Sequence, residues 1–209
     1  MPILIEPKSY LSAFENGENV QIQYKRFQLE DLIRVYDIVG ELLLKAKLDS
    51  FIPFVKTSLK ELVQNAVKAT QKRIYFQKSG LDISKNYEEG MVNFSEFLQS
   101  NKNMPIPDGI LFSAEIRFEQ MKDSLRIVVK NYGEVTSEER KSLELMFSRG
   151  KTMHSVQELL ENEVKQKEGG GLGISMIIVL GRSLKINDPL KFESKNGFTE
   201  FVLTIPVNS

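Results

Sequence analysis

Three short segments of the chain carry residue types that suit one nucleotide-binding site. The first places an acid, an amide and an amine, Glu61, Asn65 and Lys68, on one face of a helix by their i, i+4 and i+7 spacing. The second, 131–133, ends a strand with a polar residue and a glycine, and the third, 169–173, is a glycine run that opens an apolar helix. An amide oxygen beside a carboxylate suits Mg²⁺, a hard ion that shares its ligands with phosphates.

The glycine run is the most specific of the three. Glycines expose backbone N–H groups, and a helix N-terminus adds partial positive charge, so 169–173 predicts a phosphate site, with a flexible hinge as the alternative. The run has neither a directly preceding strand nor the Gly-Lys-Ser/Thr ending of a P-loop. Asn131 is suited to the edge of an adenine base and Gly133 to close backbone approach, although an ordinary turn also explains the pair. A solvated helix face is the alternative for the first segment.

Composition bounds the classes of protein to which the chain can belong. The 209 residues are 41% hydrophobic, with 28 basic and 28 acidic residues and no cysteine. This favours one domain with an extension or one enlarged domain, gives no reason to expect a nucleic acid or a membrane as partner, and excludes disulfides and thiolate chemistry. The start of the chain lacks the basic flank and apolar stretch of a signal peptide, so we expect a cytoplasmic protein.

Hydrophobic periodicity predicts the elements that position these segments. Alternation predicts strands at 20–24, 113–120 and 125–129, and a closing hairpin at 192–205 that turns at Asn196-Gly197. Helical spacing predicts helices at about 28–47 and 53–72, and capping boxes begin two more at about 137–147 and 155–166. A further, mostly buried helix is predicted at 174–184.

Two segments between these elements are expected to be irregular. Residues 77–110 are polar, and only 91–98 hints at a helix, so we predict a loop-rich insertion that is partly mobile. Residues 147–152 form a basic, glycine-containing connection at the start of an expected mobile lid, about 148–170.

At this point the motifs resemble those of a known family, the histidine-kinase-type ATPases of the GHKL or Bergerat fold, which include sensor kinases and gyrase, mismatch-repair and heat-shock ATPases. Residues 61–70 resemble the N box and 129–133 a degenerate G1 box. Residues 147–150 resemble the F-box region, 169–175 the G2 box, and 197–206 the closing hairpin of sensor-kinase catalytic domains. The resemblance covers about 55–206 in the right order, apart from the insertion.

The resemblance implies a two-layer α/β (α+β) sandwich with a mixed, largely antiparallel sheet and helices on one face. The opposite face should be open or covered by the N-terminal segment. Residues 1–50 would pack on or extend an ATP-binding domain at 51–209. Helix 28–47 could instead pair with a second copy of the chain.

The resemblance also implies site residues. Asn65 would ligate Mg²⁺, and Glu61 takes the position that activates water in hydrolytic relatives, a role that kinase relatives need not share. Asn131 replaces the adenine-reading aspartate, and Thr199 would support the water network around the base. The residues implied to contact ATP are Asn65, Lys68, Asn131, Gly133, Arg149, Lys151, Gly169, Gly171, Leu172, Gly173 and Thr199.

Two departures from the family pattern affect the expected activity. An amide at position 131 makes a weaker bond to the base than a carboxylate, and Val135 stands where a second glycine is usual. The single histidine, His154, lies in the expected lid, so the helix at 28–47 carries no phosphoacceptor. We therefore expect either phosphate transfer from ATP to a partner protein in signal transduction, such as a response regulator, or a non-catalytic module that senses ATP and ADP. ATP hydrolysis coupled to dimer closure is the weaker alternative.

Overall fold

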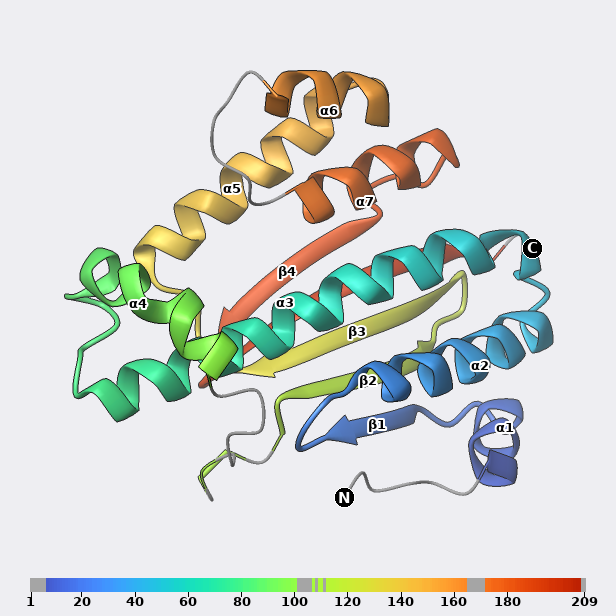
Figure 1. The fold of residues 1–209 in the computed structure, drawn as a ribbon. Coiled ribbons are helices and arrows are strands. Elements are labelled where there is room, and N and C mark those ends of the chain that lie inside the picture. Colours follow the sequence, from blue (N-terminus) through green and yellow to red (C-terminus); the bar gives the residue numbers. More distant parts are fainter. Residues whose placement is uncertain (1–6, 101–106, 108, 111, 165–171, 208–209) are drawn as a thin grey trace.

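The computed structural model describes residues 7–100, 107, 109–110, 112–164 and 172–207, which form an α+β fold of two layers (Figure 1). Within these residues, every helix is too short or too polar to cross a lipid bilayer. The elements in chain order are α1 (Pro7–Glu15), β1 (Val20–Tyr24), α2 (Leu29–Lys45), the 3-10 turn η1 (Asp49–Phe51), α3 (Ile52–Ser79), α4 (Tyr87–Ser100), β2 (Ala114–Gln120), β3 (Ser124–Tyr132), α5 (Ser137–Thr152), α6 (Val156–Val164), α7 (Leu172–Ser183), β4 (Leu190–Lys195) and β5 (Phe198–Pro206).

A five-stranded sheet in the order β1-β2-β3-β5-β4 forms one layer. Every pairing between its strands is antiparallel, so the expectation of a mixed sheet is wrong and that of a largely antiparallel one is confirmed. The excursion through α5, α6 and α7 returns the chain so that β5 also lies antiparallel to β3. Asn196 and Gly197 turn the last hairpin with φ of 54° and 80°, as their types predict.

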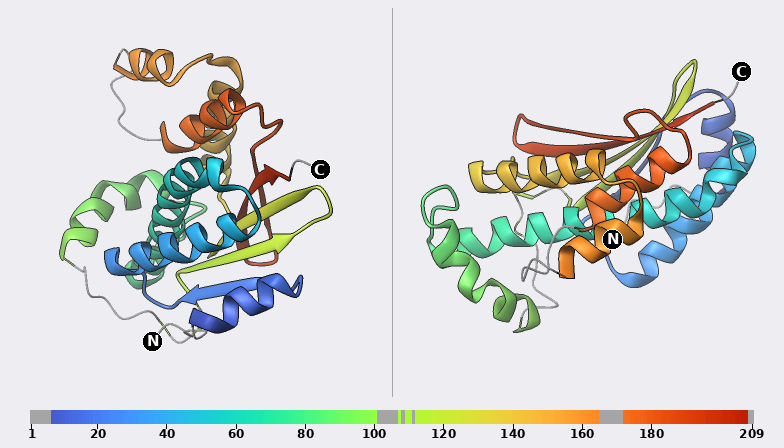
Figure 2. Two further views of the ribbon diagram at one scale, coloured as in Figure 1. Left: turned by 90° about the vertical axis from the view of Figure 1, so that its right-hand side faces the viewer. Right: turned by 90° about the horizontal axis from the view of Figure 1, so that it is seen from above.

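One face of the sheet holds the main hydrophobic core. Alternate strand residues such as Ile116, Ile127 and Leu203 are completely buried against the helices. Helices α2, α3 and α7 lie on this face, as Figure 2 shows from two further sides. The prediction of helices on one face is therefore confirmed.

The opposite face of the sheet carries charged side chains that pair with one another. Arg117 reaches three carboxylates, at 2.9 Å from Glu115, 3.2 Å from Glu119 and 3.4 Å from Glu200. This face therefore has the polar character of a sheet surface that no helix needs to cover.

Helix α3 is longer than predicted and continues to Ser79, where Gly80 ends it in the left-handed conformation with φ of 69°. The segment at 77–110, expected to be rich in loops, contains the 14-residue helix α4. Gly90 permits α4 to pack closely against α3, because a Cβ at position 90 would lie 2.3 Å from the ring of Phe76. Sequence reasoning detected only the middle of α4, since the rest of the helix is polar.

Helix α5 includes the residues predicted to form a basic connection. Gly150 is helical and buried, and a Cβ at this position would lie 2.7 Å from Cβ of Ile178 on α7. The glycine thus marks a close contact between two helices rather than a break in one of them.

The C-terminal end of α5 is also fixed by hydrogen bonds from α7. Arg182 donates from Nη1 to the carbonyl oxygens of Gly150, Lys151 and Met153, at 3.1, 2.6 and 3.0 Å. Residues 148–152, expected to begin a mobile lid, therefore form the last turn of a helix that is anchored to α7.

Candidate functional site

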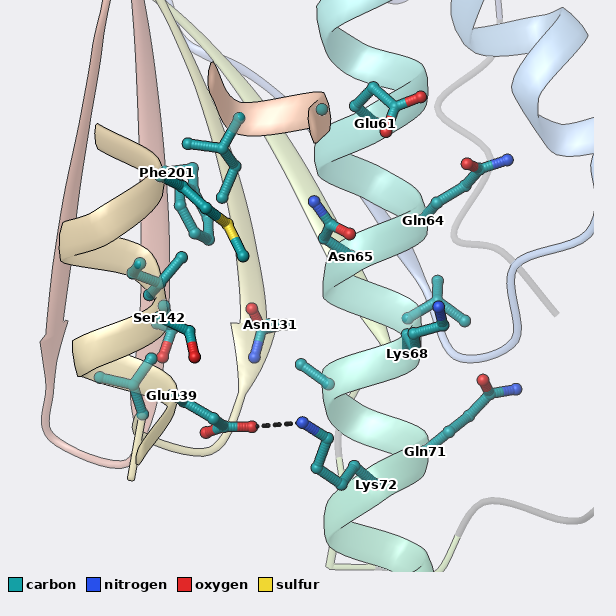
Figure 3. Close-up of a pocket in the computed structure, with 18 of the residues that line it drawn as sticks. Glu61, Gln64, Asn65, Lys68, Gln71, Lys72, Asn131, Glu139, Ser142 and Phe201 are labelled. Atoms are coloured by element: carbon teal, nitrogen blue, oxygen red, sulfur yellow. Dashed lines mark hydrogen bonds and ion pairs between the residues drawn. The ribbon is translucent and has the colours of Figure 1, made fainter. Parts of the chain in front are cut away.

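A pocket of about 1060 Å³ lies on the helical side of the sheet. Its walls come from α3, α5, the N-terminal end of α7, the ends of β3 and β5, and the first turn of α2, with Tyr87 of α4 at one margin. Figure 3 shows α3 crossing the pocket, with Asn131 and Glu139 facing it from one side. The volume slightly exceeds the range of roughly 300–1,000 Å³ that is common for ligand pockets.

The pocket brings together seven of the residues expected from the sequence, although they come from four separate elements. These are Glu61, Asn65, Lys68, Asn131, Leu172, Gly173 and Thr199. Three others do not line it. Gly133 lies behind the side chain of Arg73, and Arg149 and Lys151 lie in the last turn of α5. Gly169 and Gly171 lie outside the described residues.

The polar face of α3 divides the pocket into two sides. In Figure 3, Asn65 and Lys72 point toward Asn131 and Glu139, whereas Lys68 leaves the helix on the other side with its two glutamine neighbours. A rotation of about 100° per residue explains this division, because positions 64, 68 and 71 are turned away from 65 and 72. Lys68 therefore shares the pocket with Asn65 but not the side that Asn131 faces.

Asn131 and Thr199 form the floor at the paired ends of β3 and β5. They are direct partners in the strand register and each is only 2% exposed. Asn131 donates from its amide nitrogen to the carbonyl oxygen of Tyr132 at 3.0 Å, and Thr199 donates from its hydroxyl to the carbonyl oxygen of Gly133 at 2.8 Å. The amide nitrogen of Asn131 is thereby fixed, which orients its oxygen as the acceptor for a ligand.

Glu61 lies against the N-terminal end of α7. A Cβ added at Gly173 would lie 2.3 Å from Oε2 of Glu61, so the glycine leaves the space that this carboxylate fills. Glu61 and Asn65 both offer oxygen atoms to the pocket, and oxygen donors of this kind fit Mg²⁺.

An ion cluster at the Tyr87 end of the pocket was missed by sequence reasoning. Glu139 on α5 accepts hydrogen bonds from Lys72 at 2.8 Å and from Arg73 at 2.9 and 2.5 Å, and the three side chains are only 11–13% exposed. Lys72 also donates to the hydroxyl of Tyr87 at 3.0 Å. The only sequence signal was the capping box of Thr136 and Glu139, which predicted a helix start and not an ion pair.

The cluster strongly perturbs the acid at its centre. Burial raises the pKa of Glu139, but the hydrogen bond and charge of Arg73, with the charge of Lys72, outweigh it and hold the pKa at about 2. With Lys68, Lys72 and Arg73 against Glu61 and Glu139, the charged residues described as lining the pocket leave it net positive. Such a pocket favours an anionic ligand.

Comparisons with known proteins assign no activity to this geometry. No protein-family profile matches the chain. A curated protein from Treponema pallidum (strain Nichols), itself described as uncharacterized, is 29% identical over 136 residues. That match covers 62% of this chain, which spans about a quarter (26%) of the relative's length.

A solved structure was also found. It is a chain in the crystal structure of the SiaB-SiaC complex from Pseudomonas aeruginosa, with 13% identity and a TM-score of 0.48. The similarity covers 95% of this chain and 96% of that chain.

Proposed function

We propose that the chain binds Mg·ATP in this pocket and transfers the γ-phosphoryl group to a partner protein, as a cytoplasmic signalling module with the Bergerat fold at 51–209. The observation that supports this proposal is the convergence of Asn65, the Asn131–Thr199 floor and Gly173 in one net-positive pocket. These elements are far apart in sequence, and each carries a residue type that suits its place in the family motif, with Asn131 as an amide in place of the usual aspartate.

Each wall then has a defined task. The oxygen of Asn131 accepts from the amino group of adenine, and Asn65, beside Glu61, would hold Mg²⁺, which would neutralise phosphate charge. The N-terminal end of α7 offers its N–H groups to the phosphates. Lys68, on the side of the pocket that α2 borders, adds a positive charge.

The transfer itself exchanges one phosphorus–oxygen bond for another. The acceptor oxygen of the partner bonds to the γ-phosphorus as the bond to the β,γ-bridging oxygen breaks. ADP leaves with that electron pair, and the proton of a hydroxyl acceptor passes to a base, a role that Glu61 can fill. His154 is exposed and does not line the pocket, which supports an acceptor on another chain.

Calorimetric titration with Mg·ATP and Mg·ADP tests the site. Asn65→Ala should weaken binding of Mg·ATP at least tenfold, and EDTA should reduce wild-type affinity to a similar extent. Asn93→Ala, on the exposed side of α4, is the matched control and should bind like wild type. Wild-type affinity in Asn65→Ala would refute the assignment.

A non-catalytic nucleotide sensor is the second candidate. The ion cluster that borders the pocket links α3 to α4 through Tyr87 and to α5 through Glu139, so occupancy can affect surfaces on both helices. Incubation with labelled ATP and candidate partners separates the two functions. Label on the partner supports the kinase, and nucleotide-dependent partner binding without label supports the sensor.

A further inference from the structure

The side chain of Arg73 covers Gly133, the glycine that the sequence motif predicts to lie directly against the ligand. Gly133 has φ of 94°, and a Cβ there would lie 2.6 Å from Nε of Arg73 and 2.9 Å from its Cδ. Arg73 lines the pocket and Gly133 does not. The surface offered to a ligand at this end of β3 is therefore the arginine side chain that lies over the glycine.

The guanidinium group is held in one orientation by its in-plane hydrogen bonds. Nη1 donates to the carbonyl oxygen of Ala69 at 3.2 Å and to Glu139 at 2.9 Å. Nη2 donates to the carbonyl oxygen of Glu134 at 2.6 Å and to Glu139 at 2.5 Å. All four terminal N–H bonds thus have protein acceptors, and the group that remains for a ligand is mainly its flat face.

We propose that the face of the Arg73 guanidinium is the platform on which the nucleobase stacks, a step that rests on the proposed binding of a purine nucleotide. A guanidinium is planar and weakly hydrated, so it stacks on aromatic rings. Asn131, which lines the same pocket, would read the edge of the same base, while Arg73 supports its face. The bidentate contact with Glu139 fixes the plane before the ligand arrives.

Stacking makes a specific prediction because it acts on the base and not on the phosphates. Arg73→Lys keeps a positive charge beside Glu139 but removes the planar group. Stacking of a base on a flat side chain typically changes the affinity for the ligand by about 10- to 100-fold. We expect Arg73→Lys to weaken ATP and GTP by about tenfold each, since stacking tolerates either purine.

Inorganic tripolyphosphate with Mg²⁺ is the matched probe without a base. Arg73→Lys should bind it within about twofold of wild type, and this retained binding also reports a folded pocket. Arg126→Lys, on the opposite face of the sheet, is the control substitution and should change neither ligand. Isothermal calorimetry of the full chain measures the wild type and both variants.

The outcomes separate the inference from the proposed function. Equal loss of ATP and tripolyphosphate, or no loss of ATP, would overturn the stacking platform while leaving nucleotide binding in place. A wild-type chain that binds tripolyphosphate as tightly as ATP would overturn it as well. Failure of the wild-type chain to bind either ligand would refute the proposed function together with the platform.

Discussion

Gly173 leaves room for the carboxylate of Glu61, because a Cβ at position 173 would lie 2.3 Å from Oε2. The contact joins the middle of α3 to the first turn of α7. A carboxylate near a helix N-terminus gains about 0.3–1 kcal/mol from the helix dipole. The absence of a side chain at position 173 therefore makes room for an acidic side chain. This role is additional to the phosphate contact that the glycine run predicts.

Gly173→Ala should displace Glu61 and weaken Mg·ATP affinity or phosphate transfer about tenfold. The fold should tolerate the change, because the contacted atom is the far end of a flexible side chain. Thermal unfolding without nucleotide shows whether the fold tolerates the change, and the added shift with Mg·ATP reports the affinity. Transfer of label from ATP to a partner measures the phosphate transfer.

A double-mutant cycle gives the control for this prediction. In a Glu61→Ala background the added methyl group meets no carboxylate, so Gly173→Ala should then change nucleotide affinity little. Additive losses in the double variant would show that the two residues act independently and would contradict the displacement.

Gly150→Ala should destabilise the protein by about 1–3 kcal/mol, the usual range for an overpacked core. The new Cβ would lie 2.7 Å from Cβ of Ile178 and 3.0 Å from the carbonyl oxygen of Ser175, and neither atom can rotate away. Urea denaturation should show a lower midpoint with an unchanged slope.

Gly40→Ala is the matched helical control for this measurement. A Cβ at position 40 would meet only Nζ of Lys56, at 3.9 Å, so α2 should gain roughly 0.5–1 kcal/mol of helix propensity. If both alanines shifted the midpoint in the same direction, the close packing of α5 on α7 would not be what selects Gly150.

The contrast between the predicted and observed elements follows from where their information lies. Asn196-Gly197 and the apolar stripe of α2 are local signals, and both predicted their elements correctly. Gly150 was misinterpreted because a glycine can break a helix or let another helix approach closely, and only the position of Ile178 decides between the two. The pocket residues that were predicted correctly lie in short motifs, where the residue types and the order of the motifs along the chain were enough to identify them.

The ion cluster lay beyond such reasoning for a related reason. Arg73 and Glu139 are 66 residues apart, and nothing local distinguishes Arg73 from any other basic residue on a solvated helix. Their pairing depends on how α5 lies against α3, which is a property of the whole fold. The sequence likewise could not predict that Arg73 covers Gly133, because this contact depends on how α3 lies against the end of β3.

Glu139 should make stability depend on pH in the acid range. Its pKa is lowered from 4.5 to about 2: burial raises it, but the bonds and charges of Arg73 and Lys72 lower it by more. A carboxyl whose folded-state pKa lies below its unfolded value stabilises the fold fully above the unfolded pKa. The contribution, about 3 kcal/mol from this shift, is then lost as pH falls from about 5 to about 2.

Glu139→Gln removes this titration, so the variant should be less stable than wild type at pH 7 and the gap should narrow toward pH 3. Urea denaturation at a series of pH values measures the free energy of unfolding of both proteins. The other carboxylates titrate in both, so their contributions cancel in the difference between wild type and Glu139→Gln. Glu18→Gln, at an exposed position between α1 and β1, is the control and should run parallel to wild type. A gap between wild type and Glu139→Gln that stayed constant from pH 7 to pH 3 would mean that the charge of Glu139 contributes nothing to folding, because only an ionised carboxylate gains from two adjacent cations.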